Sequence, residues 1–198
     1  MSTIAVLGNG RVGGNLAGAL TRAGHEVTVA GRAPGAAADA ARAARIVINA
    51  TPGASSLDRL VALREELRDT ILVDVSNATV DGPDGLPADL VYPGSSLAEQ
   101  LQEALPDTRV VKTLNTMLFP VMTAPGTLAQ APDAFLSGED AQAKQVVREL
   151  LADLGWREEW ITDLGGIRTA RATEAAILFV PHVIRSSGFA RFAISIAR

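Results

Sequence analysis

Short apolar runs alternate along the chain with segments whose apolar residues recur at helical spacing. Several runs are continuously apolar, including Ile46-Val47-Ile48 and Ile71-Leu72-Val73. This pattern is typical of parallel strands whose two faces are both covered by helices. It predicts strands at Thr3–Leu7, Glu26–Ala30, Arg45–Ala50, Thr70–Val75, Arg109–Thr113, Ala134–Ser137 and Trp156–Ile161.

The segments between these runs predict helices. Ser96 with Glu99, and Ser137 with Asp140, have the spacing of capping boxes at which two of the helices begin. The alternation of strands and helices predicts a doubly wound, mostly parallel α/β sheet. The helices are expected near residues 11–23, 33–44, 56–67, 97–105 and 138–154.

Two stretches break this rhythm. Residues 77–95 and 117–133 are rich in Gly and Pro and predict irregular loops, the second with one helical turn. After the last predicted strand the chain is mostly helical from about Ile167, and it is apolar on more than one face. We therefore expect a main domain over residues 1–162 and a helical segment over 163–198 that faces the substrate and contacts a second subunit.

Composition narrows the class of protein. Of 198 residues, 47% are hydrophobic and 20% charged, which is typical of a globular chain. There is no Cys and there are only two His, so a metal site is not expected. A net charge of −4 argues against nucleic-acid binding. With no leader visible and no long apolar stretch, the sequence predicts a cytoplasmic protein without membrane contact.

A glycine-rich turn follows the first predicted strand. Gly8, Gly10 and Gly13 have the Gly-x-Gly-x-x-Gly spacing and stand between a strand and a helix. Such glycines form a tight turn, admit a pyrophosphate close to the backbone and let the helix pack on the strand. A glycine-rich turn without a ligand is the alternative, but this context favours a dinucleotide. The expected contacts are Gly8, Asn9, Gly10, Arg11, Val12 and Gly13.

The end of the second predicted strand indicates which dinucleotide binds. NAD sites commonly place an Asp or Glu there, for the ribose hydroxyls. This chain has Gly31-Arg32 instead, and its next acid is Asp39. Because a guanidinium can pair with a 2′-phosphate, the sequence favours NADP(H) over NAD(H). An Arg32 that is only solvated is the alternative.

Small polar residues follow three further strands. Because the carboxyl ends of parallel strands meet at one edge, these residues are expected to contact the nicotinamide half and the substrate, or else to form ordinary turns. The polar residues are Thr51, which stands between Ala50 and Pro52; Ser76 and Asn77; and Asn115 and Thr116, and the expected contacts include Ala50 and Pro52.

Groups that could move a proton are scarce. His25, His182 and Tyr92 lie in contexts that favour structural roles, and Lys112 in a strand is expected to form a structural ion pair. No catalytic residue is therefore assigned. Hydride transfer between two stacked rings needs positioning and exclusion of water rather than an acid or base.

Four motifs of this chain together resemble those of a known protein family. They are Gly8–Gly13; Gly31-Arg32, where the family commonly has Ser-Arg; Val110–Thr116; and Leu164–Glu174, with Ala170 where the family has Ser. Over nearly its whole length the chain resembles the coenzyme F420-dependent NADP oxidoreductases. In that family a small, usually dimeric, NADP-binding Rossmann domain passes a hydride between NADPH and the deazaflavin F420. The resemblance implies that Arg168, Arg171 and Glu174 bind the substrate.

The charge of the C-terminal segment bears on the substrate, and other functions remain open. The segment from Leu164 to Arg198 is basic, since it contains one glutamate and five arginines, at 168, 171, 185, 191 and 198. This positive charge would suit an anionic substrate such as F420. The alternative is that the arginines only stabilise helix ends. An NADPH-dependent reductase of a flavin, imine or ketone remains open, as does a non-catalytic NADP-binding sensor. The apolar C-terminal segment predicts a homodimer.

Overall fold

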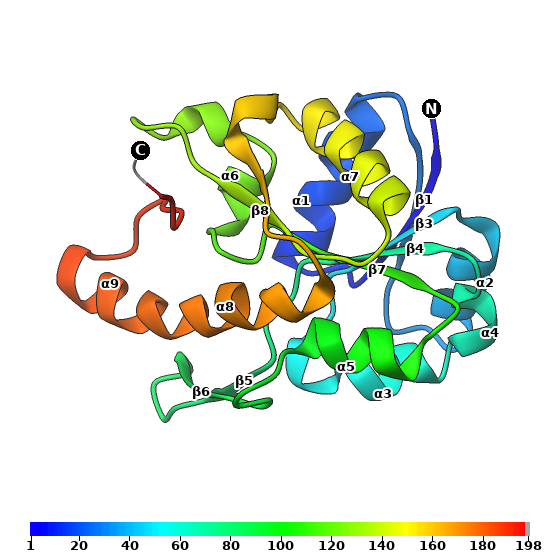
Figure 1. Cartoon of the computed structure of the whole chain (residues 1–198), viewed down its shortest axis with the longest axis horizontal. Helices are drawn as coiled ribbons and strands as arrows, with labels where there is room; N and C mark the ends of the chain where they lie inside the picture. The colour runs from blue at the N-terminus through cyan, green and yellow to red at the C-terminus, as the bar shows by residue number, and fades with distance from the viewer. Residues whose placement is uncertain (197–198) are drawn as a thin grey trace.

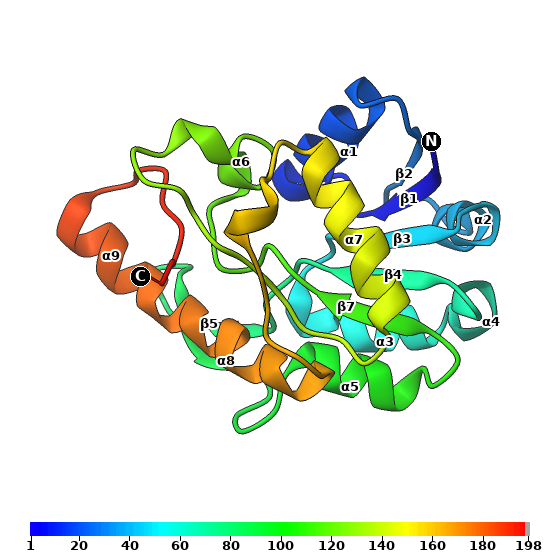
Figure 2. The ribbon, with the colours of Figure 1, turned by 45° about the horizontal axis from the view of Figure 1, so that its top comes forward.

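Five parallel strands form the central sheet of the computed structural model, which describes residues 1–196 (Figures 1 and 2). The strands are β1 (Thr3–Leu7), β2 (Glu26–Ala30), β3 (Ile46–Asn49), β4 (Ile71–Asp74) and β7 (Arg109–Lys112), in the order β2-β1-β3-β4-β7. Each lies within one or two residues of its predicted position. The doubly wound, mostly parallel fold predicted from the sequence is confirmed.

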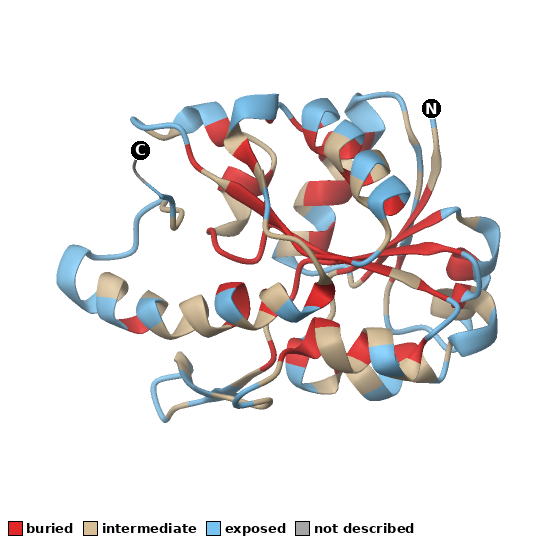
Figure 3. Cartoon of the chain, viewed as in Figure 1, coloured by how far each residue is buried: buried red, intermediate tan, exposed pale blue. Residues whose placement is uncertain are grey.

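Helices cover both faces of this sheet. One face carries α1 (Arg11–Arg22) and α7 (Ala141–Asp153). The other carries α2 (Ala36–Ala43), α3 (Ser56–Val61), α4 (Arg64–Leu67) and α5 (Leu97–Ala104). The strand side chains alternate between the two cores, so Ile4 and Val6 pack with α1 whereas Ala5 and Leu7 pack on the opposite side. Figure 3 shows the inner strands and the inward helix faces as buried, whereas most residues of the edge strand β2 are exposed.

The strand order creates a crevice at one edge of the sheet. From β1 the chain passes to β2 on one side and then to β3 on the other. Ligands of open α/β sheets bind outside the carboxyl ends of the strands at such a reversal. Turns after β1, β2 and β3 therefore surround the expected site.

The segment predicted as a loop over residues 77–95 contains a hairpin instead. Strands β5 (Thr79–Asp81) and β6 (Pro87–Leu90) pair antiparallel. The Gly and Asp residues between them form the turn, in which Gly85 has a φ of 72°. The prediction of a loop is wrong here because both strands are short, so the turn residues dominate the sequence pattern. The second predicted loop does hold a helical turn, α6 (Phe119–Met122).

Two other elements differ from the predictions. The last strand is β9 (Ile161–Asp163), which pairs in parallel with β8 (Ala134–Leu136), and a 3-10 turn precedes it. Trp156 is a buried anchor whose indole Nε1 donates to Met122 O at 3.0 Å, so its apolar character reflects core packing rather than a strand. The helix predicted over 56–67 is divided into α3 and α4.

The two predicted capping boxes have different outcomes. Ser96 Oγ accepts a hydrogen bond from Glu99 N at 3.1 Å and caps α5 as expected. At α7 the cap is Asp140, which accepts from Ala143 N at 2.7 Å. Ser137 is buried and exchanges backbone hydrogen bonds with Lys112, so it joins β8 to β7 instead of beginning a helix.

The C-terminal segment crosses the carboxyl edge of the sheet. Helices α8 (Ala170–Ala175) and α9 (Val180–Ser187) are joined by a 3-10 turn, and Gly188, with a φ of 75°, ends the helical run. The chain then folds back: Leu118 N donates to Phe192 O and Ile194 N donates to Thr116 O, both at 3.0 Å. Within residues 1–196, none of the helices has the length and apolar character that a membrane crossing needs.

Candidate functional site

The glycine-rich turn has the geometry that its spacing predicts. Gly8 has a φ of 109°, and a Cβ there would lie 2.5 Å from Ala50 O. A Cβ on Gly13 would lie 1.9 Å from Gly8 O, so α1 packs against the turn only because position 13 has no side chain. A Cβ on Gly10, in contrast, would meet nothing within 4 Å. The space above Gly10 is therefore open for a ligand to approach the backbone.

Helix α1 begins directly at this open space. Its first residue is Arg11, and no side chain caps its N-terminus. The free N–H groups and the positive end of the helix dipole together favour a phosphate at this position. The pyrophosphate of a dinucleotide therefore fits the turn.

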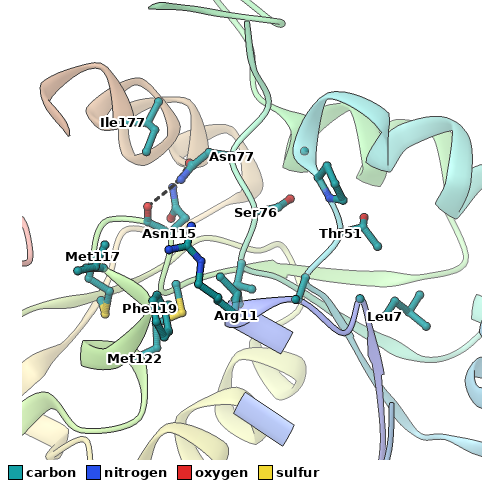
Figure 4. Close-up of a pocket in the computed structure, with 18 of the residues that line it drawn as sticks. Leu7, Arg11, Thr51, Ser76, Asn77, Asn115, Met117, Phe119, Met122 and Ile177 are labelled. Atoms are coloured by element: carbon teal, nitrogen blue, oxygen red, sulfur yellow. Dashed lines mark hydrogen bonds between the residues drawn. The ribbon is translucent and has the colours of Figure 1, made fainter. Parts of the chain in front are cut away.

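A cavity of about 980 Å³ extends from the turn across the ends of the strands (Figure 4). It brings together most of the residues singled out from the sequence. Those that line it are Gly8, Asn9, Gly10, Arg11, Val12, Gly31, Arg32, Ala50, Thr51, Pro52, Ser76, Asn77, Asn115 and Thr116. Gly13 lies beneath the turn and shapes it without lining the cavity.

The charged side chains that line this cavity are all positive. Arg11, Arg32 and Arg59 are the charged side chains among the described residues that line the cavity, and this lining includes no Asp or Glu. None of the three forms an ion pair within the described part of the chain. The whole protein carries a net charge of −4, so this cavity differs from its surroundings and suits a polyanion.

Polar side chains at the ends of β3 and β4 form a buried hydrogen-bond network. Asn49 Nδ2 donates to Asp74 Oδ1 at 2.8 Å, and Ser76 Oγ donates to the same oxygen at 2.7 Å. Thr51 Oγ1 donates to Asn49 Oδ1 at 2.7 Å. Because Asn49 and Asp74 are fully buried, they hold the cavity-facing Thr51 and Ser76 in fixed positions.

Lys112 completes this network beneath the cavity. Its Nζ lies 2.7 Å from Asp74 Oδ2 and 2.8 Å from Glu174 Oε1, and the side chain is 1% exposed. Burial disfavours the charge, but the two carboxylates outweigh that effect and raise the pKa of Lys112 above its ordinary value. The structural ion pair expected for Lys112 is confirmed, with a second carboxylate in addition.

Two amide side chains bridge the ends of β4 and β7 at the cavity wall. Asn77 Nδ2 donates to Asn115 O, and Asn115 Nδ2 donates to Asn77 Oδ1, both at 2.9 Å (Figure 4). The hydroxyl of the neighbouring Thr116 is buried and has no hydrogen-bond partner within residues 1–196. A ligand group placed here would find a partner in Thr116.

One part of the cavity wall, from α6 and the C-terminal segment, is apolar. Phe119 and Met122 on α6 face Ile177 near α8, with Met117 beside them (Figure 4). Arg11 lies over the Phe119 ring, 5.7 Å from its centroid. Asn15 on α1 fixes this wall, because its Nδ2 donates to Phe119 O and to Thr123 Oγ1, both at 2.8 Å. The returning C-terminal chain contributes Phe189, Phe192 and Ile194.

Three of the expected substrate residues are not brought to the cavity. The Glu174 carboxylate accepts from Leu97 N at 2.9 Å and Ala98 N at 3.2 Å, at the start of α5. Arg171 Nε donates to Glu99 Oε1 at 3.1 Å, and Arg168 is exposed nearby. The Glu174 carboxylate is buried and also pairs with Lys112, so in this structure it contacts the protein rather than the cavity. Arg198 lies outside the described residues.

Sequence reasoning missed two sets of lining residues. Arg59 on α3 had no recognisable motif around it, since a single Arg on a helix is ordinary. The apolar wall around Phe119 was read as part of a loop, although its Met and Phe residues could have indicated burial. Neither His lines the cavity; His25 Nε2 lies 3.0 Å from Asp153 Oδ2.

Comparisons with known proteins agree with this geometry. The family model for coenzyme F420-dependent NADP oxidoreductases matches residues 3–57. The F420-dependent NADP reductase of Methanocaldococcus jannaschii is 28% identical over 139 residues, which cover 69% of this chain and 60% of that protein. The uncharacterized oxidoreductase YfjR of Bacillus subtilis is 30% identical over 188 residues, with coverages of 89% and 61%. This chain thus spans about three fifths of the length of each relative.

A solved structure matches the chain over its full length. The protein from Arthrobacter sp. FB24, provisionally named an F420-dependent NADP-reductase, is 40% identical with a TM-score of 0.91, and the match covers 100% of both chains. The glycine-rich turn, the strand order and this similarity lead to one assignment. The chain belongs to the coenzyme F420-dependent NADP oxidoreductase family.

Proposed function

We propose that this chain is an NADP(H)-dependent oxidoreductase that passes a hydride between NADPH and coenzyme F420. One observation carries the proposal: the described lining of the cavity has three arginines and no His, Lys, Tyr, Asp or Glu. The site can therefore hold a polyanionic dinucleotide, but it offers no ordinary acid or base. Hydride exchange between two rings is the reaction that needs none.

The side chains of the site would act by position. NADPH, when bound, supplies the hydride. The turn at Gly8–Gly10 and the N-terminus of α1 hold its pyrophosphate, while Arg32 holds the 2′-phosphate. Thr51, Ser76 and Asn77 line the path from the turn toward the apolar wall, where they orient the nicotinamide. Because the buried network immobilises Thr51 and Ser76, the orientation is set before the ligand arrives.

The apolar end would receive the acceptor. Phe119, Met122 and Ile177 form walls that suit a flat ring and exclude water from the transferring hydride. Asn115 and Thr116 lie between this end and the strand edge, where they would contact the ring's polar atoms. Arg168 and Arg171 remain candidates only for the acceptor's anionic tail, since neither lines the cavity.

The test is NADPH oxidation with a panel of acceptors. With F420, the deazaflavin's visible band should be lost as NADPH is consumed. Turnover with FMN, an imine or a ketone, and none with F420, would assign another acceptor to the same site. Tight NADPH binding with no turnover on any acceptor would indicate a sensor. No binding of NADPH would overturn the proposal.

We also propose that the protein is a homodimer built by the C-terminal segment. Phe179 and Phe189 are each 67% exposed, and Ile196 is 53% exposed. Leu178 and Val183, on the same segment, are only half-buried. A symmetric partner would cover these apolar side chains, which one sheet face cannot do alone.

A further inference from the structure

A second arginine lines the cavity in addition to Arg32, whose end of the cavity is the proposed adenosine subsite. Gly31 and Arg32 from the end of β2 and Ala37 from α2 line one side of this end. Arg59 from α3 lines the same cavity from a different element, as does Leu63. Two guanidinium groups from separate parts of the chain therefore line one cavity.

The position of Arg59 leaves its terminal nitrogens available. Its Nε donates to Ser55 Oγ at 3.1 Å, which holds the side chain against α3. The two Nη atoms have no hydrogen-bond partner or ion pair within residues 1–196. Arg42 and Arg68, on neighbouring helices, are instead paired with carboxylates. The Arg59 side chain is therefore fixed through its Nε, while its Nη atoms remain available to a ligand at the cavity wall.

On the side of Arg32, position 31 adds no side-chain donor of its own. Gly31 has no side chain, and a Cβ there would lie 3.0 Å from Asn9 Nδ2 and 3.4 Å from Asn9 Cγ. The Asn9 amide occupies the space that a hydroxyl at position 31 would need. A phosphate presents three acceptor oxygens and close to two negative charges, more than the single guanidinium of Arg32 can satisfy.

We propose that Arg59 is a specificity-determining residue that binds the 2′-phosphate of NADP(H) together with Arg32. The inference rests on the proposed function. Arg59 would donate the hydrogen bonds to the phosphate that Gly31, which has no side chain, does not donate. Stacking of Arg59 on the adenine is the competing role, and the two differ in whether they sense the phosphate.

The experiment compares two fragments of the cofactor on the full chain. Binding of 2′,5′-ADP and of 5′-AMP is measured by calorimetry for wild type and Arg59→Ala. We expect 2′,5′-ADP to bind about tenfold more weakly to Arg59→Ala, with AMP unchanged, because one charge-assisted contact is lost. Arg64→Ala, at an exposed arginine on the adjacent α4, is the matched control and should change neither affinity.

Each other outcome is distinct. Equal weakening of both fragments would show that Arg59 contacts the adenine, and unchanged binding of both would show no contact; either overturns the inference. If wild type binds neither fragment nor NADPH, the proposed function itself fails. If wild type prefers 2′,5′-ADP and Arg59→Ala keeps that preference, only the role of Arg59 fails. Unchanged melting temperatures would confirm that exposed Arg59 does not support the fold.

Discussion

Arg32 is the residue on which cofactor choice depends. It lies at the end of β2, lines the cavity and has no acidic partner among the described residues. Arg32→Ala should weaken NADPH binding by about 10–150-fold, since one charge-assisted pair to a phosphate contributes about 1.5–3 kcal/mol. NADH binding should hardly change. Fluorescence titration with both cofactors measures this, and equal dissociation constants in wild type would remove the argument.

Lys112 is the residue on which the buried network depends. Lys112→Met would leave the carboxylates of Asp74 and Glu174 buried without their cation. The free energy of unfolding in urea should fall by about 3–5 kcal/mol. Lys144→Met is the control, because Lys144 pairs with Asp163 nearer the surface and should cost about 1 kcal/mol or less. Similar losses in the two variants would contradict the role assigned to the network.

At the scale of elements, the Arg171–Glu99 ion pair helps to join the C-terminal helices to the sheet domain. Glu99 on α5 accepts from Arg171 on α8 and from Ser96 Oγ. Partial burial raises the pKa of Glu99, but these hydrogen bonds outweigh burial, and the pKa lies below its ordinary value. A carboxylate of this kind stabilises the fold above its unfolded pKa of about 4.3 and loses that effect as the pH falls through the folded value.

The pH dependence of the melting temperature should reveal this contact. Wild type should melt higher than Glu99→Gln at pH 7, and the difference should shrink as the pH falls below about 4.3. Glu103→Gln, on the same helix, is the control because Glu103 is exposed and forms no ion pair within residues 1–196. A difference that stays constant from pH 7 to pH 3 would show that the charge of Glu99 is not responsible.

For the whole molecule, the decisive property is its oligomeric state. Two chains of 20.6 kDa form a dimer of about 41 kDa, which sedimentation at micromolar concentration would detect. Phe179→Glu should produce monomers, because the exposed ring would be replaced by a charge in the proposed interface. A monomeric wild type would contradict the proposal. If the wild type and the Phe179→Glu variant both sediment as dimers, the dimer interface does not include Phe179.

The local pattern of the chain was sufficient for the sheet and for the glycine-rich turn. Continuous apolar runs identify buried parallel strands, and the Gly8, Gly10 and Gly13 spacing defines a backbone shape that few other residues allow. The hairpin over 79–90 was missed because each of its strands is only three or four residues long. Over such a short length, turn residues dominate the pattern.

Only the tertiary structure decided which distant side chains meet. Glu174 lies 77 residues from Leu97, yet its carboxylate caps α5 and pairs with Lys112. Arg59 and Arg32 line one cavity although 27 positions separate them, because α2 and α3 lie on the same face of the sheet. Periodicity and turn chemistry act over a few residues, so they determine elements. The contacts that make a site depend on how those elements pack, which no local pattern records.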